Sequence, residues 1–135
     1  MKIDRVDHLA IAVKSIEEGL AFYRDVLGIA CTGGETVEAE GVRVAFLPVG
    51  VTRLELLEPI RPDSAVAKFV ESRGPGLHHV CFVVADLSAA LDELRGSEVR
   101  VLSERIGAEG SRVAFLHPKS TGGVLIELRE ARPRE

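Results

Sequence analysis

A five-residue segment occurs twice in the chain, and this repeat limits the folds that are open to it. Residues 43–47 read Arg-Val-Ala-Phe-Leu, and residues 112–116 repeat the same five letters. An internal repeat of this kind indicates two supersecondary units that must pack on each other to complete one core. The chain is therefore expected to be built twice from one pattern of strands and helices.

The two halves show the same order of apolar patterns. Alternation of apolar and polar residues is typical of a strand, whereas a stripe at a spacing of three to four residues is typical of a helix. Ser15 and Gly28 bracket the helical stripe of the first half, and Asp86 and Gly96 bracket that of the second. Each half is thus predicted to be a β-α-β-β-β module. The expected strands lie at residues 6–13, 29–38, 42–49 and 52–58, and again at 78–84, 98–105, 112–117 and 123–129.

These modules are predicted to form a single α+β domain over residues 1–135. Module one covers about residues 3–60, a connecting helix and turn cover about 62–76, and module two covers about 77–130. A chain of 135 residues is long enough to bury about two-thirds of its unfolded surface, as one domain does. The expected architecture is an open, barrel-like mixed sheet with a cleft on its concave side.

Composition excludes several classes of partner. A net charge of −4 and only 4% aromatic residues argue against binding of nucleic acid, which needs a basic face or stacking platforms. No apolar run approaches the roughly 18 residues that span a membrane. The first residues lack the pattern of a secretory signal, and two cysteines fit a reducing compartment, so a cytoplasmic protein is expected. The closing segment 129–135 is expected to be a solvated tail.

A histidine and a glutamate lie at matched positions in the two halves. Glu55 follows His8 by 47 residues, and Glu127 follows His79 by 48. In the expected strands both histidines share a face with small side chains, and both carboxylates face the same cleft if their apolar neighbours face the helices. A carboxylate inside an apolar strand is costly unless it is paired or binds a cation. Two imidazoles and two carboxylates suit a divalent metal such as Zn, Co, Ni, Mn or Fe.

Ion pairing is the alternative explanation of the two carboxylates. Arg53 and Arg129 each lie two residues from one of them and therefore on the same strand face. The remaining histidines have other expected roles. His78 points away from its neighbour His79 and is assigned to structure, whereas His117 lies either at the mouth of the cleft or at a solvent edge.

Five segments of the chain resemble a known family. They are Asp7–Val13, Leu54–Pro59, Ser64–Phe69, Gly76–Val80 and Phe115–Leu128. On these segments the chain is similar to the methylmalonyl-CoA epimerase family, within the vicinal-oxygen-chelate superfamily and its glyoxalase fold. The resemblance runs from about residue 3 to residue 130. The last segment is the most specific of the five, whereas the first is generic to the superfamily.

The resemblance implies a metal-dependent acyl-CoA epimerase. His8, His79 and Glu127 match metal ligands of the family, and Glu55 matches a position at which relatives have Gln or Glu. One divalent ion per chain is implied, with cobalt favoured by the resemblance and Zn, Ni or Mn also compatible. The implied reaction interconverts the (2R) and (2S) isomers of methylmalonyl-CoA by removal of the C2 proton, through an enolate that the metal stabilises. A homodimer is also expected, because such sheets expose edges that need cover.

Glu55 and Glu127 are the predicted catalytic carboxylates. Some relatives place a Glu, a candidate base, where this chain has Val44, so that assignment does not transfer. Glu55 is preferred as the acid/base, because a loosely held carboxylate beside the metal is well placed to take a proton. Glu40 and a metal-bound hydroxide remain alternatives.

A group of polar residues near the end of the last repeat strand is predicted to bind substrate. Guanidinium and ammonium groups there would hold the substrate carboxylate or the CoA phosphates. The alternative is a solvated basic loop. The predicted substrate-binding residues are Arg112, His117, Lys119 and Ser120.

Three rival functions use the same fold. A glyoxalase I-like isomerase would share the metal site and the proton-transfer logic. A non-catalytic protein that binds a small molecule in the cleft would need no metal. An iron dioxygenase with two His and one Glu is less compatible, because Glu55 would crowd a position that must stay open.

Overall fold

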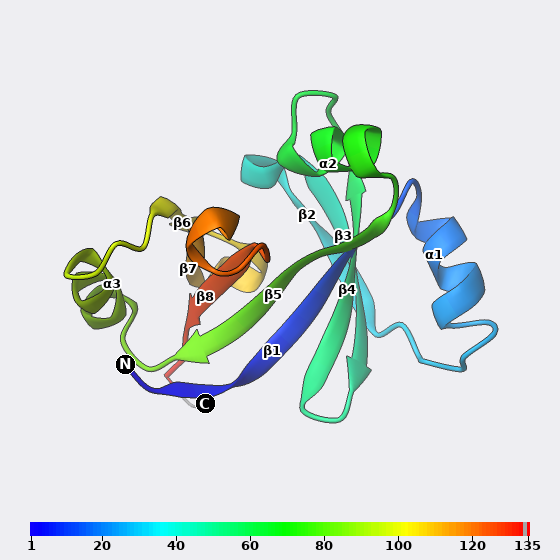
Figure 1. The fold of residues 1–135 in the computed structure, drawn as a ribbon. Helices are drawn as coiled ribbons and strands as arrows, with labels where there is room; N and C mark the ends of the chain where they lie inside the picture. Colours follow the sequence, from blue (N-terminus) through cyan, green and yellow to red (C-terminus); the bar gives the residue numbers. More distant parts are fainter. Residues whose placement is uncertain (134) are drawn as a thin grey trace. The chain divides into compact units, whose positions relative to one another are not determined.

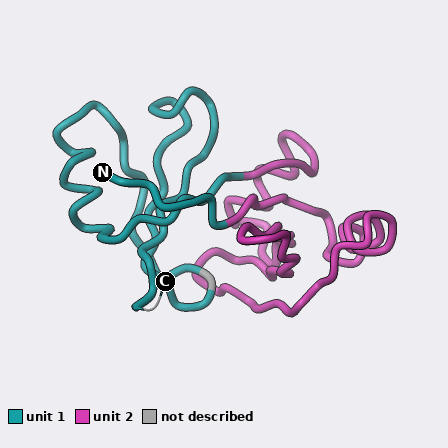
Figure 2. Tube along the Cα trace, turned by 90° about the horizontal axis from the view of Figure 1, so that it is seen from below, with its two compact units in different colours: residues 1–7, 79–135 teal, residues 8–78 magenta. Residues whose placement is uncertain are grey.

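The computed structural model describes residues 1–133 and 135 and divides into two compact units. Unit 2 is the continuous segment His8–His78, and unit 1 combines Met1–Asp7 with His79–Glu135 (Figure 2). The first seven residues therefore group with the second half of the chain, which the repeat did not indicate.

Unit 2 carries the first module. Its strand order is β2-β3-β4-β1, with β1 and β4 parallel and the other two pairs antiparallel (Figure 1). The parallel pair sets Ala10 beside Glu55, and the β3–β4 hairpin sets Phe46 opposite the same Glu55. The elements are β1 (Ile3–Ala12), α1 (Ile16–Tyr23), β2 (Gly33–Val37), η1 (Glu38–Glu40), β3 (Val42–Val49), β4 (Thr52–Pro59) and α2 (Ala65–Arg73).

Unit 1 repeats this arrangement. Its order is β5-β8-β7-β6, with β5 and β8 parallel and the other pairs antiparallel, which matches β1-β4-β3-β2 of unit 2. Phe115 lies opposite Glu127, as Phe46 lies opposite Glu55. The predicted pair of β-α-β-β-β modules is confirmed. The elements are β5 (Gly76–Val84), α3 (Leu87–Arg95), β6 (Val101–Ile106), η2 (Ala108–Gly110), β7 (Arg112–Leu116), η3 (Pro118–Ser120) and β8 (Ile126–Glu130).

Side-chain caps begin the helices where the sequence predicts. The Ser15 hydroxyl accepts a hydrogen bond from Glu18 N at 3.1 Å, and the Asp86 carboxylate accepts one from Ala89 N at 3.0 Å. These bonds satisfy N–H groups that have no partner within the helix. The predicted end of α1 is wrong, because the helix stops at Tyr23 and the chain continues in turns up to Gly28.

Each unit has its own apolar core between its helix and its strands. In unit 2, Leu56 of β4 is fully buried under α1, and in unit 1 Leu91 of α3 is fully buried against β7 and β8. The helix α1 packs closely, since a Cβ built on Gly19 would lie 2.7 Å from Leu56 Cδ1. The matching position of α3, four residues after the cap, is Ala90. The helix of unit 1 therefore carries a methyl group at this position, whereas in unit 2 a methyl group would require the Leu56 side chain to move.

The first residue of the repeated segment makes equivalent contacts in the two units. In unit 2, Arg43 contacts Glu58 Oε1 at 3.3 Å, and the same oxygen accepts a hydrogen bond from Ile16 N at the start of α1. In unit 1, Arg112 contacts Glu130 Oε2 at 3.3 Å, and that oxygen accepts from Leu87 N at the start of α3. Each Arg–Glu pair thus fixes the beginning of a helix to the sheet that it covers.

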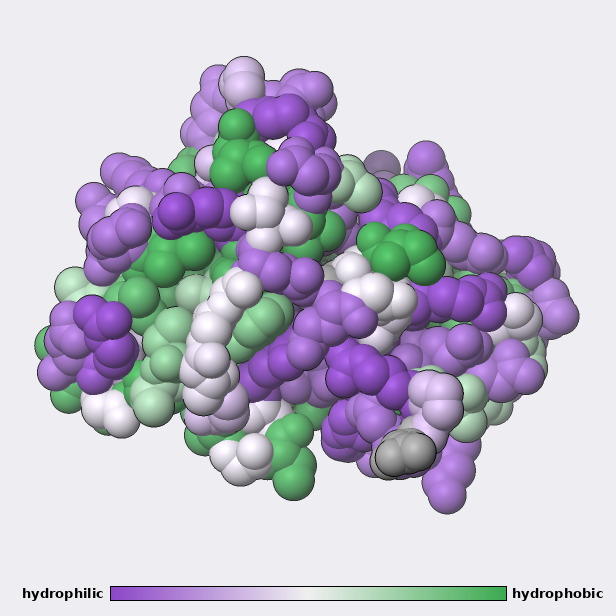
Figure 3. Space-filling view, turned by 180° about the vertical axis from the view of Figure 1, so that it is seen from behind, coloured by the Kyte–Doolittle hydropathy of each residue, from purple (hydrophilic) through white to green (hydrophobic). Residues whose placement is uncertain are grey.

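Apolar and polar side chains both reach the surface (Figure 3). Around the end of α1, Phe22, Val26 and Leu27 are 50%, 69% and 54% exposed. Among the described residues, none of the helices combines the length and the apolar character that a membrane span requires.

Candidate functional site

One His–Glu pair lies in unit 2. His8 of β1 and Glu55 of β4 are 4% and 3% exposed, and His8 Nδ1 lies 3.2 Å from Glu55 Oε2. The neighbours Ala10 and Ala12 are fully buried and small. Leu56, the next residue of β4, packs in the core under α1, so Glu55 faces the other side of the sheet. The predicted pairing of strand faces is therefore correct for this unit.

A guanidinium group also holds Glu55. Arg53 approaches Glu55 Oε2 through Nη2 at 2.9 Å and through Nε at 3.0 Å, so it contacts the same oxygen as His8. The guanidinium lies over the Phe46 ring, 4.2 Å from its centroid. The ion pair that was the alternative to a metal is thus present at Glu55. Phe46 is a contact that sequence reasoning missed, although its place opposite Glu55 in the repeat offered a signal.

The second His–Glu pair lies in unit 1. His79 Nε2 is 2.8 Å from Glu127 Oε1, and the two residues are 4% and 5% exposed. The Phe115 ring meets the His79 ring edge to face, with centroids 5.4 Å apart. A Cβ built on Gly107 would lie 3.7 Å from Glu127 Oε2 and 3.2 Å from both methyl groups of Val113. The chain at Gly107 therefore passes close to the carboxylate, which the sequence did not indicate.

Arg129 contacts the carboxylates of Asp7 and Glu135. Its Nη2 lies 2.8 Å from Asp7 Oδ1 and 2.8 Å from Glu135 Oε2, and the residue is 3% exposed. The hydrogen bond to Glu135 raises the pKa of Arg129, and it holds the pKa of Glu135 well below its usual range. The expected solvated tail is wrong at Arg129 and at the Glu135 carboxylate, because the buried Arg129 holds this carboxylate in a partly buried contact. Arg134 lies outside the described residues.

The predicted substrate-binding residues do not form one group. Arg112 begins β7 on the face of Ala114 and Leu116, which pack in the core with α3, and it contacts Glu130 and Ser88. That face is opposite to the one on which Phe115 meets His79. Arg112 has a structural role at the start of α3, at the far end of β7 from the other three residues.

His117, Lys119 and Ser120 lie together after β7. His117 Nδ1 accepts a hydrogen bond from Lys119 N at 3.0 Å, and Ser120 Oγ accepts one from Arg100 N at 3.0 Å. Two of these three side chains therefore shape the loop, and Lys119 is exposed. Their binding of substrate stays a prediction.

The two other residues considered from the sequence lie in unit 2. The His78 ring meets the Phe69 ring of α2 edge to face, with centroids 5.0 Å apart, and its expected structural role stays a prediction. Glu40 ends η1, directly after β2.

Each His–Glu pair offers donors that suit a divalent metal. An imidazole nitrogen and a carboxylate oxygen are ligands of Zn, Co, Ni and Mn, and here both are buried on the side of the sheet away from the helices. Placing a carboxylate in such surroundings is unfavourable without a compensating charge. In unit 2 Arg53 supplies one such charge. The donor sets fit the metal that the sequence predicts, and the metal's identity stays a prediction.

Comparisons with known proteins establish the family. The model of the Glyoxalase/Bleomycin resistance protein/Dioxygenase superfamily matches residues 7–115. This chain belongs to that superfamily. Both the predicted fold class and the predicted resemblance are confirmed.

Two curated relatives and one solved structure are epimerases of acyl-CoA substrates. The mitochondrial methylmalonyl-CoA epimerase of Mus musculus is 43% identical, over 96% of this chain and 75% of that protein. The ethylmalonyl-CoA/methylmalonyl-CoA epimerase of Cereibacter sphaeroides is 40% identical, over 95% of this chain and 98% of that one. The solved structure is a methylmalonyl-CoA epimerase in complex with methylmalonyl-CoA and NH4+. It is 40% identical with a TM-score of 0.93, and the match covers 99% of both chains.

Proposed function

We propose that this chain is a methylmalonyl-CoA epimerase that inverts C2 of its substrate by proton transfer. The likeness to epimerases of this substrate along almost the whole chain carries the proposal. The C2 hydrogen of methylmalonyl-CoA lies between a thioester and a carboxylate, so its removal places negative charge on the thioester oxygen. The reaction needs a group that takes the proton and surroundings that accept this charge.

In this proposal His8, Glu55, His79 and Glu127 together hold one divalent cation. Support comes from the burial of all four residues and from the matched position of the two pairs in the repeat. When bound, the cation supplies Lewis acidity toward the thioester oxygen, an effect of several kcal/mol on the charged species. Cobalt is the proposed metal, with Zn, Ni or Mn as alternatives.

Glu55 is the proposed acid/base. Arg53 and His8 both contact its Oε2, which holds the carboxylate in one orientation. We assign Glu55 as the group that takes the C2 proton, since a general base must lie within hydrogen-bond reach of the proton it removes. Glu127, paired with His79, is assigned to the metal. Inversion then requires a second acid to deliver a proton to the opposite face of C2, while Glu55 releases the proton it took to solvent.

The proposal also covers the domain organisation, the location and the oligomeric state of the protein. Residues 1–135 would act as one functional domain, in the cytoplasm, and as a homodimer that covers exposed apolar side chains such as Phe22, Val26 and Leu27. Light scattering after size-exclusion chromatography tests the dimer.

Deuterium exchange tests the reaction. Metal-loaded protein is mixed with one isomer of methylmalonyl-CoA in D₂O, and mass spectrometry with chiral analysis follows C2. We expect metal-dependent uptake of one deuterium together with inversion, because the proton that leaves exchanges with solvent. Chelator-treated protein and substrate alone are the controls, since this C2 hydrogen also exchanges slowly without enzyme.

Exchange no faster than that of substrate alone, with metal content verified, would overturn the proposal. The hemithioacetal of methylglyoxal and glutathione would then be tested as substrate for the glyoxalase I-like alternative. Protein inactive on both substrates, and without stoichiometric metal, would be examined as a small-molecule binder.

A further inference from the structure

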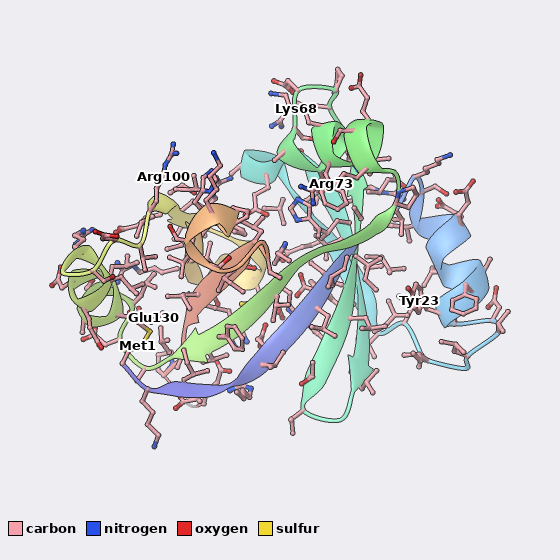
Figure 4. All side chains as sticks on the ribbon, in the orientation of Figure 1. Met1, Tyr23, Lys68, Arg73, Arg100 and Glu130 are labelled. Atoms are coloured by element: carbon pink, nitrogen blue, oxygen red, sulfur yellow. The ribbon has the colours of Figure 1, made fainter. Side chains whose placement is uncertain are left out.

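Two neighbouring cations of unit 1 lack the carboxylate partner that most of the described arginines of that unit have. Arg95, Arg112 and Arg129 each lie within 3.3 Å of a carboxylate oxygen. Arg100 and Lys119 are exposed, and neither forms an ion pair with any residue that the structure describes. Figure 4 shows the Arg100 side chain extending outward from the loop before β6. In a chain with a net charge of −4, such a pair is a local attraction for anions.

Hydrogen bonds join the two loops that carry these cations. His117 N donates to Arg100 O at 2.9 Å, and Arg100 N donates to Ser120 Oγ at 3.0 Å. Lys119 N donates to His117 Nδ1 at 3.0 Å. His117 and Ser120 therefore hold Arg100 and Lys119 on one corner of unit 1, and we call these two cations the basic corner.

The basic corner lies at the same end of the unit 1 sheet as Glu127. Phe115 is in register with Glu127, and the loop of Lys119 begins two residues later, where β7 ends. Two residues of a strand span about 7 Å. Arg100 directly precedes β6 at this same end, where Val101 pairs with Leu116.

The chemistry of the corner favours phosphate over a single carboxylate. Both side chains are exposed, so an anion held there stays partly hydrated, and exposed contacts gain most when the ligand carries several charges. The proposed substrate has such groups in its CoA portion, remote from the acyl group that must reach the buried carboxylates. Arg112 does not compete for this role, because Glu130 already pairs with it on the other face.

We propose that Arg100 and Lys119 bind the phosphate groups of the CoA portion of the substrate. This assignment rests on the proposed function, and it adds Arg100 to the residues that the sequence suggested. It also makes His117 and Ser120 supports of the corner.

Truncated substrates test the corner. The R100Q/K119Q double variant is compared with wild type on methylmalonyl-CoA, methylmalonyl-dephospho-CoA and methylmalonyl-pantetheine. We expect the KM for methylmalonyl-CoA to rise about tenfold with unchanged kcat, because exposed contacts aid binding and not chemistry. The KM for the pantetheine thioester, which lacks phosphate, should stay the same. Raising the salt concentration should increase the wild-type KM more than that of the variant.

Lys2→Gln is the control for each of the single variants R100Q and K119Q. Lys2 is also exposed, and it lies near Val84 and Asp86 at the other end of β5, so its loss removes one positive charge elsewhere on unit 1, as each single variant does at the corner. The dephospho substrate distinguishes the 3′-phosphate from the diphosphate: a variant effect that disappears with it assigns the 3′-phosphate, and one that persists assigns the diphosphate. Either result supports the corner.

An equal rise in KM on the pantetheine thioester, or a rise in both single variants no larger than that of Lys2→Gln, would overturn the assignment. Failure of the proposed function is recognised separately, as wild-type protein inactive on all three substrates. In that case, calorimetry with CoA alone decides: weaker binding by the double variant supports the corner, and equal binding rejects it.

Discussion

The two His–Glu pairs occupy the same positions in the repeat but have different surroundings. In unit 2, Arg53 stands two residues before Glu55 and contacts it at 2.9 Å while lying over Phe46. In unit 1, Arg129 stands two residues after Glu127 and contacts Asp7 and Glu135. The cation over Phe115 in unit 1 is Arg105, which donates a hydrogen bond to Ser103.

This difference indicates that matched strand positions do not give matched chemistry. A carboxylate contacted by a guanidinium already has its charge compensated, so it gains less from a metal ion. On the proposed function, we therefore expect Glu55, which Arg53 contacts, to act in proton transfer, and Glu127, which lies 2.8 Å from His79, to bind the metal. These expected roles differ although the repeat places the two residues at matched positions.

The largest expected effects come from removing each carboxylate in turn. Glu127→Gln should lose the metal and lower kcat/KM by about three orders of magnitude, the size expected of Lewis-acid stabilisation. Glu55→Gln should keep most of its metal and lower kcat by about 10²-fold to 10⁴-fold, as loss of a general base does. Metal content by mass spectrometry and C2 exchange separate the two cases. Equal loss of metal from both variants would refute the division of roles.

A smaller effect is expected from Arg53→Gln. The variant loses a charged hydrogen bond and the stacking on Phe46, and leaves Glu55 less well compensated. The free energy of unfolding of the metal-free protein should fall by about 2 kcal/mol, measured by urea denaturation. In the R53Q/E55Q double variant, the free energy of unfolding should fall by less than the sum of the decreases in the two single variants.

Arg105→Gln provides the control in unit 1. Arg105 is exposed, so its loss should cost about 0.5 kcal/mol or less. Similar losses for Arg53 and Arg105 would mean that the contact with Glu55 adds nothing to stability.

The smallest effect concerns the carboxylate that binds Arg129. Glu135→Gln should lower stability by about 1 kcal/mol at neutral pH, since the pair is partly exposed. Because Arg129 depresses the pKa of Glu135, the stabilisation is present above the ordinary value of 4.5 and is lost as the pH falls below it. Wild type and variant should therefore converge in acid, as followed by thermal unfolding. A difference that does not shrink as the pH falls below 4.5 would point to another cause, and Glu98→Gln, at an exposed site, controls for net charge.

The sequence predicted the strands that carry the site because their patterns are regular. Strands β3 and β4 match the expected bounds almost residue for residue. Strand β8 begins three residues later than expected, at Ile126, because Gly122 and Gly123 adopt positive φ angles in the loop before it. Helix α1 ends earlier than predicted. Its apolar residues continue at a helical spacing after Tyr23, but the chain there forms turns.

The partners of the arginines were harder to predict. Position in a strand gave the face of Arg53 and Arg129 but not which carboxylate each would reach, since long side chains reach several neighbours. Asp7, more than 120 positions away in the chain, is one of the two that Arg129 contacts. The contacts of Arg112 were also hard to predict. A residue at the end of a strand can contact the helix side of the sheet as well as the cleft side, and Arg112 contacts Ser88 of α3.

The close packing of Gly19 on Leu56 has a consequence for the exchange of helices between the two halves. A helix grafted from unit 1 into unit 2 would place the methyl group of Ala90 at the position of Gly19, where a Cβ lies 2.7 Å from Leu56 Cδ1. The two halves share the pattern of their strands, but the helix of unit 2 has Gly19 where the helix of unit 1 has Ala90. Exchange of the helices between the halves would therefore require the Leu56 side chain and the core around it to repack.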